Sequence, residues 1–102
     1  MNFKIDEKAK DFIKKKSIKE IFINPDLDQK AALCTSGVVD FEVSLKGKNK
    51  DKYESILVDD ISIYYNPTMS MYFDDNEEIV ISAFGLGSFK KIYIVNEKNL
   101  LS

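Results

Sequence analysis

The order of apolar and polar residues predicts a short strand followed by a helix at the start of the chain. Residues 3–5 alternate between apolar and polar, which is typical of a strand with one buried face. Apolar residues then recur at helical spacing over 9–13, and Asp6 stands where a helix needs an N-terminal cap. We therefore expect a strand at residues 3–5 and a helix over about residues 7–16.

Most of the remaining chain has the alternating or β-branched pattern of strands, interrupted by turn residues. Between two of these strands only Asp59 and Asp60 remain, which predicts a tight hairpin whose two central residues need a positive φ. Pro25 is expected to end a strand, and residues 25–37 have the composition of a loop. The expected strands are 18–24, 38–45, 53–58, 61–65, one that begins at Ile79, and 89–95.

A second short helix is expected over 67–73, because Pro67 suits the first helical position and apolar residues follow it. The links between most strands are too short for crossover connections, so the sheets should be antiparallel or mixed. The expected fold class is α+β: a small mixed or antiparallel β-sheet sandwich, or a barrel-like domain, with two short helices. With 102 residues, the whole chain, 1–102, should form a single domain.

Composition excludes several kinds of function. Fifteen lysines and no arginine oppose seventeen acidic residues, which argues against nucleic acid as a partner. No apolar run approaches the length of about 20 residues that a membrane span needs, and the start has no apolar signal core. We therefore expect a cytoplasmic protein with no membrane partner. One cysteine and no histidine exclude an internal disulfide, histidine acid–base catalysis and a Cys/His zinc site within one chain.

Four short motifs follow one another along the chain. They are residues 3–9, Cys34-Thr35-Ser36-Gly37, the hairpin Val-Asp-Asp-Ile-Ser-Ile-Tyr-Tyr-Asn-Pro at 58–67, and Leu-Gly-Ser-Phe at 86–89. Their order resembles the HesB-like domain of A-type iron–sulfur carriers. That family has a Cys-Ser-Gly turn before a long strand, a Val-Asp-Gly hairpin and a Leu-Gly-Ser-Gly-Phe turn near the end. The resemblance covers about residues 3–96 and implies a HesB-type fold with a role in iron–sulfur cluster biogenesis.

The chain departs from that family at its cysteines. Typical carriers use three, one in the central turn and two in a C-terminal Cys-Gly-Cys, whereas here Cys34 alone matches and the tail after Asn96 has none. The chain is more similar to short HesB-like proteins with a Cys-Cys or Cys-selenocysteine pair, which also lack the C-terminal pair. Thr35 occupies the second position of that pair. The resemblance therefore implies incomplete cluster-binding equipment.

Cys34 is the one candidate thiol, or metal or cluster ligand, with Thr35, Ser36 and Gly37 as its neighbouring loop. Iron–sulfur clusters usually take four thiolates, so iron or a cluster would have to be shared across a homodimer and completed by other ligands. Alternatively, Cys34 is a small packing residue. We expect no catalytic residues, and no residue is identified as a metal ligand with certainty. We also expect that one chain by itself binds no cofactor.

Other motifs have simpler explanations. The acidic run 74–78 lacks the ligand spacing of a calcium loop and fits a solvated turn. The glycines at 85 and 87 precede a predicted strand, whereas a phosphate-binding loop leads into the N-terminus of a helix, so a plain turn is expected. Asp59 and Asp60 are expected at an exposed hairpin tip, and the lysine runs at 14–16 and 46–52 on the solvated surface.

The leading hypothesis is a divergent HesB-like binding or carrier-type protein, not an enzyme, with Cys34 as its remaining thiol. A protein-interaction or structural module without metal or redox chemistry is the first alternative. A single-thiol redox protein, which would need a lowered thiol pKa, is the second. A homodimer or another protein is the expected partner.

Overall fold

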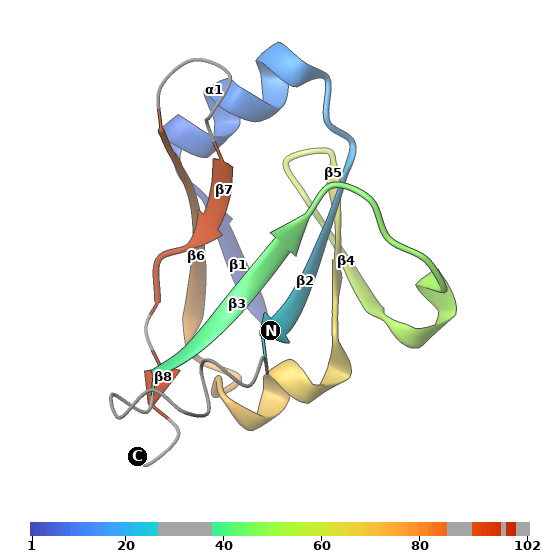
Figure 1. Cartoon of the computed structure of the whole chain (residues 1–102), viewed down its shortest axis with the longest axis vertical. Coiled ribbons are helices and arrows are strands. Elements are labelled where there is room, and N and C mark those ends of the chain that lie inside the picture. The colour runs from blue at the N-terminus through green and yellow to red at the C-terminus, as the bar shows by residue number, and fades with distance from the viewer. Residues whose placement is uncertain (27–37, 86–90, 97, 100–102) are drawn as a thin grey trace.

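A computed structural model of the chain describes residues 1–26, 38–85, 91–96 and 98–99 (Figure 1). The elements are β1 (Asn2–Ile5), α1 (Glu7–Lys16), β2 (Glu20–Asp26), β3 (Val38–Ser44), the 3-10 helix η1 (Lys50–Lys52), β4 (Glu54–Val58), β5 (Ile61–Tyr65), the 3-10 helix η2 (Pro67–Met71), β6 (Glu78–Phe84), β7 (Lys91–Ile94) and β8 (Lys98–Asn99).

The strands form two open sheets. One has three strands in the order β1-β6-β7, and the other has five in the order β4-β5-β2-β3-β8. β1 runs parallel to β6 and β2 runs parallel to β5, while the other pairs are antiparallel. The α+β class and the mixed sheets are confirmed, whereas the expected barrel-like closure is wrong for the part of the chain that the structure describes.

The hydrophobic core lies between the two sheets and under helix α1. Ile21, Ile23 and Ile63 of the larger sheet are fully buried, as are Ile79 and Ile81 of the smaller one. Helix α1 lies across one end of the sheets and contributes Ala9, Phe12 and Ile13 to the same core (Figure 1). Its apolar spacing therefore places one helical face on the sheets, as the sequence pattern predicts.

The beginning of α1 also follows the prediction. The Asp6 side chain accepts a hydrogen bond from the N–H of Ala9 at 2.9 Å, which satisfies one of the free donors of the first turn. At the other end, Ser17 adopts a left-handed conformation, and its neighbour Ile18 donates to the carbonyl of Ile13. This arrangement closes the helix without a glycine.

The expected second helix over 67–73 is not confirmed at that length, because the structure has the five-residue 3-10 helix η2 instead. Asn66 caps its start. Asn66 Oδ1 accepts from both the N–H and the hydroxyl of Thr68, and the Ser70 hydroxyl donates to the carbonyl of Pro67. Met69 and Phe73 are nevertheless buried, as their apolar character predicts.

Strand boundaries differ from the predictions by a few residues. β2 continues through Pro25, which pairs with Phe41 of β3. β5 ends opposite Ile23, so Pro25 has a neighbouring strand on one side only. Proline is tolerated at such a position, because its missing N–H need not break a hydrogen bond between strands. The strand β8 was not predicted, because Lys98 and Asn99 carry no apolar pattern and pair with β3 through the backbone.

Candidate functional site

The candidate thiol Cys34 and its neighbours Thr35, Ser36 and Gly37 lie outside the described residues. The strands that flank this segment are described. β2 ends at Asp26 and β3 begins at Val38, and the backbones of Asp26 and Asp40 are paired. The segment therefore begins and ends at one end of the larger sheet, the end opposite to helix α1 (Figure 1).

The C-terminal strand β8 pairs at the same end of the sheet. Asn99 is the backbone partner of Val38, and Lys98 is the partner of Val39 (Figure 1). The fold thus brings the C-terminal residues alongside the start of β3, directly after the Cys34 segment. In this chain the adjacent tail offers no second thiol, since Cys34 is its single cysteine.

A chain of polar side chains supports this end of the sheet. The Asn24 side-chain amide donates to the Tyr53 hydroxyl at 2.9 Å, and Asn66 Nδ2 donates to Asn24 Oδ1 at 3.1 Å. Asn66 in turn accepts from Thr68, as described above. These bonds join β2, two residues before its last residue, to Tyr53 directly before β4 and to Asn66 between β5 and η2. The position from which the Cys34 segment starts is therefore fixed by side-chain as well as backbone bonds.

Aromatic rings hold β3 against the residues that follow η2. The ring of Phe41 lies 5.1 Å from that of Phe73 and 5.8 Å from that of Tyr72, with the latter pair edge to face. At the end of β5, the ring of Tyr65 lies 5.3 Å from that of Phe3 in β1. Burial, with a smaller contribution from Glu54, raises the pKa of Tyr65, so its phenol stays protonated at neutral pH. Tyr65 therefore contributes an aromatic ring contact and a neutral phenol to this part of the fold.

The described residues contain no group of three or more His, Cys, Asp or Glu side chains that could hold a metal ion. The acidic run 74–78 is a turn in which the N–H of Asp74 faces Glu77 Oε1 at 3.4 Å, consistent with the solvated turn predicted from its spacing. Within the described part of the chain, no helix has the length and apolar character needed to cross a membrane.

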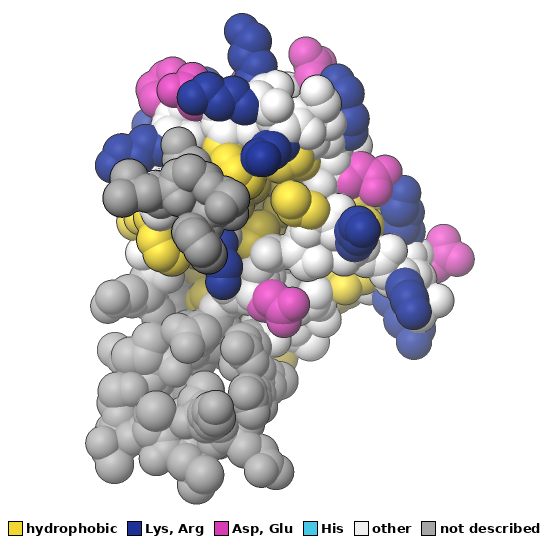
Figure 2. Space-filling view, turned by 45° about the horizontal axis from the view of Figure 1, so that its top comes forward, with side chains coloured by type: hydrophobic (Ala, Val, Ile, Leu, Met, Phe, Trp, Pro, Cys, Tyr) yellow, Lys and Arg dark blue, Asp and Glu magenta, His cyan; other side chains and the backbone are white. Residues whose placement is uncertain are grey.

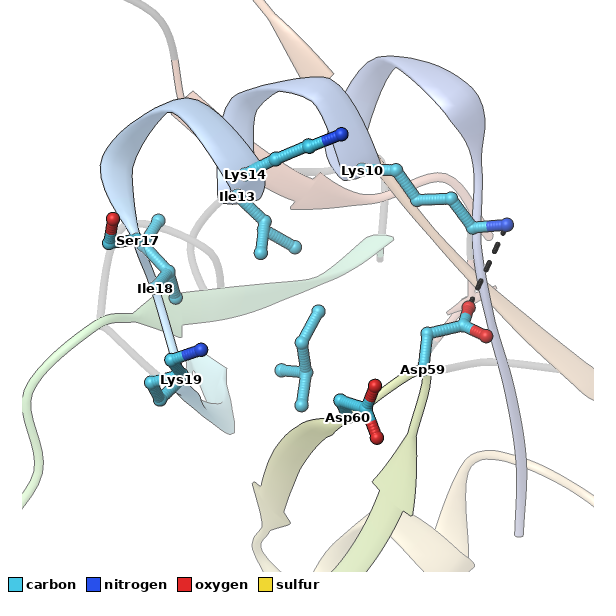
Figure 3. Close-up of a pocket in the computed structure, with 9 residues that line it drawn as sticks. Lys10, Ile13, Lys14, Ser17, Ile18, Lys19, Asp59 and Asp60 are labelled. Atoms are coloured by element: carbon cyan, nitrogen blue, oxygen red, sulfur yellow. Dashed lines mark ion pairs between the residues drawn. The ribbon is translucent and has the colours of Figure 1, made fainter.

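A pocket of about 510 Å³ lies at the other end of the molecule, between the C-terminal end of α1 and the β4–β5 turn (Figure 3). Its floor is aliphatic and its rim is charged. Figure 2, in which this end comes forward, shows hydrophobic side chains bordered by lysines and acids. The residues that line the pocket are Lys10, Ile13, Lys14, Ser17, Ile18, Lys19, Asp59, Asp60 and Ile61.

One ion pair crosses from helix to hairpin at this pocket. Lys10 Nζ lies 3.7 Å from Asp59 Oδ2 (Figure 3). It also lies 3.9 Å from Glu7 Oε1, one turn away on the same helix. Asp59 and Asp60 are exposed, as predicted for a hairpin tip, and both have positive φ angles of 50° and 65°. Sequence reasoning missed their role in a pocket, because Lys10 approaches Asp59 only through the packing of α1. The one sequence feature that could have pointed to the pocket is the Asp59-Asp60 turn, because it has two carboxylate side chains at positions where hairpins prefer asparagine and glycine.

The chain matches the family model of the CC/Se motif containing family over residues 1–97, and it therefore belongs to that family. Comparisons with the curated proteins and with the solved structures gave no match. The matched range includes Cys34, which Thr35 follows where a CC motif would have a second cysteine. The HesB-like relationship inferred from the motifs stays a prediction.

Proposed function

We propose that the protein is a HesB-like binding or carrier-type protein related to iron–sulfur cluster biogenesis, with Cys34 as its cargo-binding thiol. The observation that supports this most is membership of a family described by a CC/Se motif, over a range that includes Cys34. The position of the flanking strands is a second support. β2, β3 and β8 end or begin together beside the segment that contains the thiol.

The proposed chemistry is binding and release of a soft cargo, such as iron or a small iron–sulfur cluster. A thiolate is the ligand that such cargo prefers. One chain supplies one thiolate and a homodimer supplies two, which is fewer than the four that a cluster usually takes. Small thiols or carboxylates would complete the set. Cargo binding should therefore be weaker than in a protein with three cysteines, and it should depend on dimer formation.

Anaerobic reconstitution with iron and sulfide tests the proposal. The wild-type chain should retain iron and visible absorbance after gel filtration, at no more than one cluster for two chains. Cys34→Ser should retain neither, whereas Ser36→Ala, a control in the same segment, should behave as the wild type. Equal iron retention by wild type and Cys34→Ser, or none by either, would overturn the carrier proposal.

A protein-interaction module is the second candidate, and exposed apolar side chains favour it. Leu57 of β4 is 67% exposed, Met71 of η2 is 76% exposed and Phe84 of β6 is 56% exposed. β7 is the last strand of its three-stranded sheet in the described part of the chain, so its outer edge carries backbone groups that could pair with another strand. This function predicts that Cys34→Ser leaves the binding of partners unchanged.

A further inference from the structure

Two defined backbone turns meet at the pocket between α1 and the β4–β5 turn. Among the described residues, Ser17, Asn49, Asp59 and Asp60 are the non-glycine residues with positive φ, and all but Asn49 line this pocket. Ser17 adopts this conformation where α1 ends, and Asp59 and Asp60 adopt it in the two-residue hairpin turn, so a helix end and a tight turn form the walls of the pocket. These three residues come from two segments that are distant in the chain.

The pocket also holds charges without partners. Lys10 and Asp59 neutralise each other, but within the described residues the Lys14 ammonium, the Lys19 ammonium and the Asp60 carboxylate have no ion pair or hydrogen bond. Figure 3 shows Lys14 on the helix side above the pocket, and Lys19 and Asp60 below it. Two free cations and one free anion thus surround one cavity.

Between these charges the floor of the pocket is aliphatic. Ile13 and Ile61 are only 5% and 6% exposed, and their remaining surface faces the cavity together with the half-buried Ile18. A volume of about 510 Å³ is within the range of small-ligand sites, which combine an apolar lining with a few polar groups that orient the ligand.

We propose that this pocket binds a small zwitterion with an aliphatic body, the chemical class of aliphatic amino acids and dipeptides. The ligand carboxylate would lie between Lys14 and Lys19, and its ammonium would face Asp60. Its aliphatic side chains would cover Ile13, Ile18 and Ile61. Two cations, one anion and an apolar floor in one pocket are the groups that complement the carboxylate, the ammonium and the aliphatic part of such a molecule. The site is at the opposite end of the fold from the Cys34 segment and does not depend on the thiol.

Two-dimensional NMR of the labelled full-length chain tests this inference. Leucine, the dipeptide Leu-Leu, acetyl-Leu-Leu and Leu-Leu amide are added in separate titrations. Leu-Leu or leucine should shift the amide signals of residues 13–19 and 59–61. Which of the two binds more tightly distinguishes a dipeptide from a free amino acid as the preferred ligand, and either result supports the proposal.

The modified dipeptides identify the two charged contacts. Asp60→Asn should weaken Leu-Leu binding by about two- to fivefold, the factor that an exposed ion pair supplies, and should leave acetyl-Leu-Leu binding unchanged. The double variant Lys14→Gln, Lys19→Gln should weaken both ligands and leave Leu-Leu amide unchanged.

The controls carry the same charge change outside the pocket. They are Asp51→Asn, and the double variant Lys15→Gln, Lys48→Gln, none of whose residues line the cavity. Both should bind Leu-Leu as the wild type does. The inference is overturned if no ligand shifts residues 13–19 and 59–61. It is also overturned if the control variants lose binding as much as the pocket variants.

Discussion

Asn66 Nδ2 donates a hydrogen bond of 3.1 Å to Asn24 Oδ1, and Asn24 Nδ2 donates one of 2.9 Å to the Tyr53 hydroxyl. Three segments that are distant in the chain are thereby joined where β2 approaches its end. The Cys34 segment starts three residues beyond Asn24, directly after β2, so this contact supports the side of the molecule on which the proposed function depends.

Replacing Asn24 should loosen this end of the larger sheet. Asn24→Ala removes two hydrogen bonds and leaves the half-buried partners Tyr53 and Asn66 without them, which should lower the free energy of unfolding by about 1–3 kcal/mol. Urea unfolding measures the change. Asn76→Ala, at an exposed position of the 74–78 turn, serves as the control and should have little effect. Equal effects of the two substitutions would contradict the role given to Asn24.

Gly47 has no room for a side chain. A Cβ at this position would lie 2.4 Å from Cδ2 of Phe22, whose ring is 2% exposed and stacks on Tyr64 with 4.9 Å between centroids. Because neither ring can move without disturbing the other, Gly47→Ala should destabilise the protein by about 1–3 kcal/mol. Thermal unfolding checks this, with Lys48→Ala as an exposed neighbour that should leave Tm nearly unchanged.

The Asp59-Asp60 turn should be more stable with glycine at its second position. Asp60 has a φ of 65°, a conformation that glycine adopts without steric conflict. Relief of this strain exceeds the added entropy of the unfolded chain, so Asp60→Gly should raise the free energy of unfolding by about 0.5–1 kcal/mol.

The matched control for this substitution is Asp51→Gly. Asp51 lies in η1 and is not among the residues with positive φ, so glycine there should destabilise the protein. Denaturant unfolding of the two variants gives the comparison. A loss of stability in Asp60→Gly would show that the Asp60 side chain stabilises the turn more than its backbone conformation strains it.

The cap of α1 should make stability depend on pH. Desolvation acts to raise the pKa of Asp6, but hydrogen bonds from the side chain of Ser82 and the N–H of Ala9 outweigh it and lower the pKa below its ordinary value of 3.8. A carboxyl whose pKa is lowered on folding stabilises the folded state above its unfolded pKa. This contribution is lost as the pH falls through the folded pKa.

Asp6→Ala should therefore lower the free energy of unfolding by about 1 kcal/mol near neutral pH, and by less at pH 3. Urea unfolding of both proteins at the two pH values measures the difference. Asp6→Asn keeps a capping oxygen without the charge, so it should cost less than Asp6→Ala near neutral pH. A loss in Asp6→Ala that is the same at both pH values would rule out the charged carboxylate as the source.

The parts of the fold that the sequence predicts are those determined by local pattern. The helix over 7–16 was correct because Asp6 and the apolar spacing act within one segment. The hairpin at Asp59 and Asp60 was correct for the same reason, since a two-residue link between strands allows few geometries. In contrast, the helix expected over 67–73 is a 3-10 helix that ends at Met71, a difference in helix type and length that apolar periodicity does not register.

The candidate sites were less predictable than the fold. The hypothesis that Cys34 is functional rests on its being the single cysteine and on motif resemblance, and Cys34 lies outside the described residues. The pocket could not be predicted, because Lys10 and Asp59 belong to distant segments that meet through packing of α1 on the core. Likewise, β8 pairs through its backbone beside Val38, with side chains that give no strand pattern.

The most direct test of the carrier proposal is the rate at which Cys34 reacts with a thiol reagent as a function of pH, in the native and the unfolded protein. With a single cysteine, the signal has one source. A cargo-binding thiol should react readily in the native state, with an apparent pKa below the free-cysteine value of about 8.5. Protection of Cys34 in the native protein, lost on unfolding, would contradict the proposal and make Cys34 a packing residue.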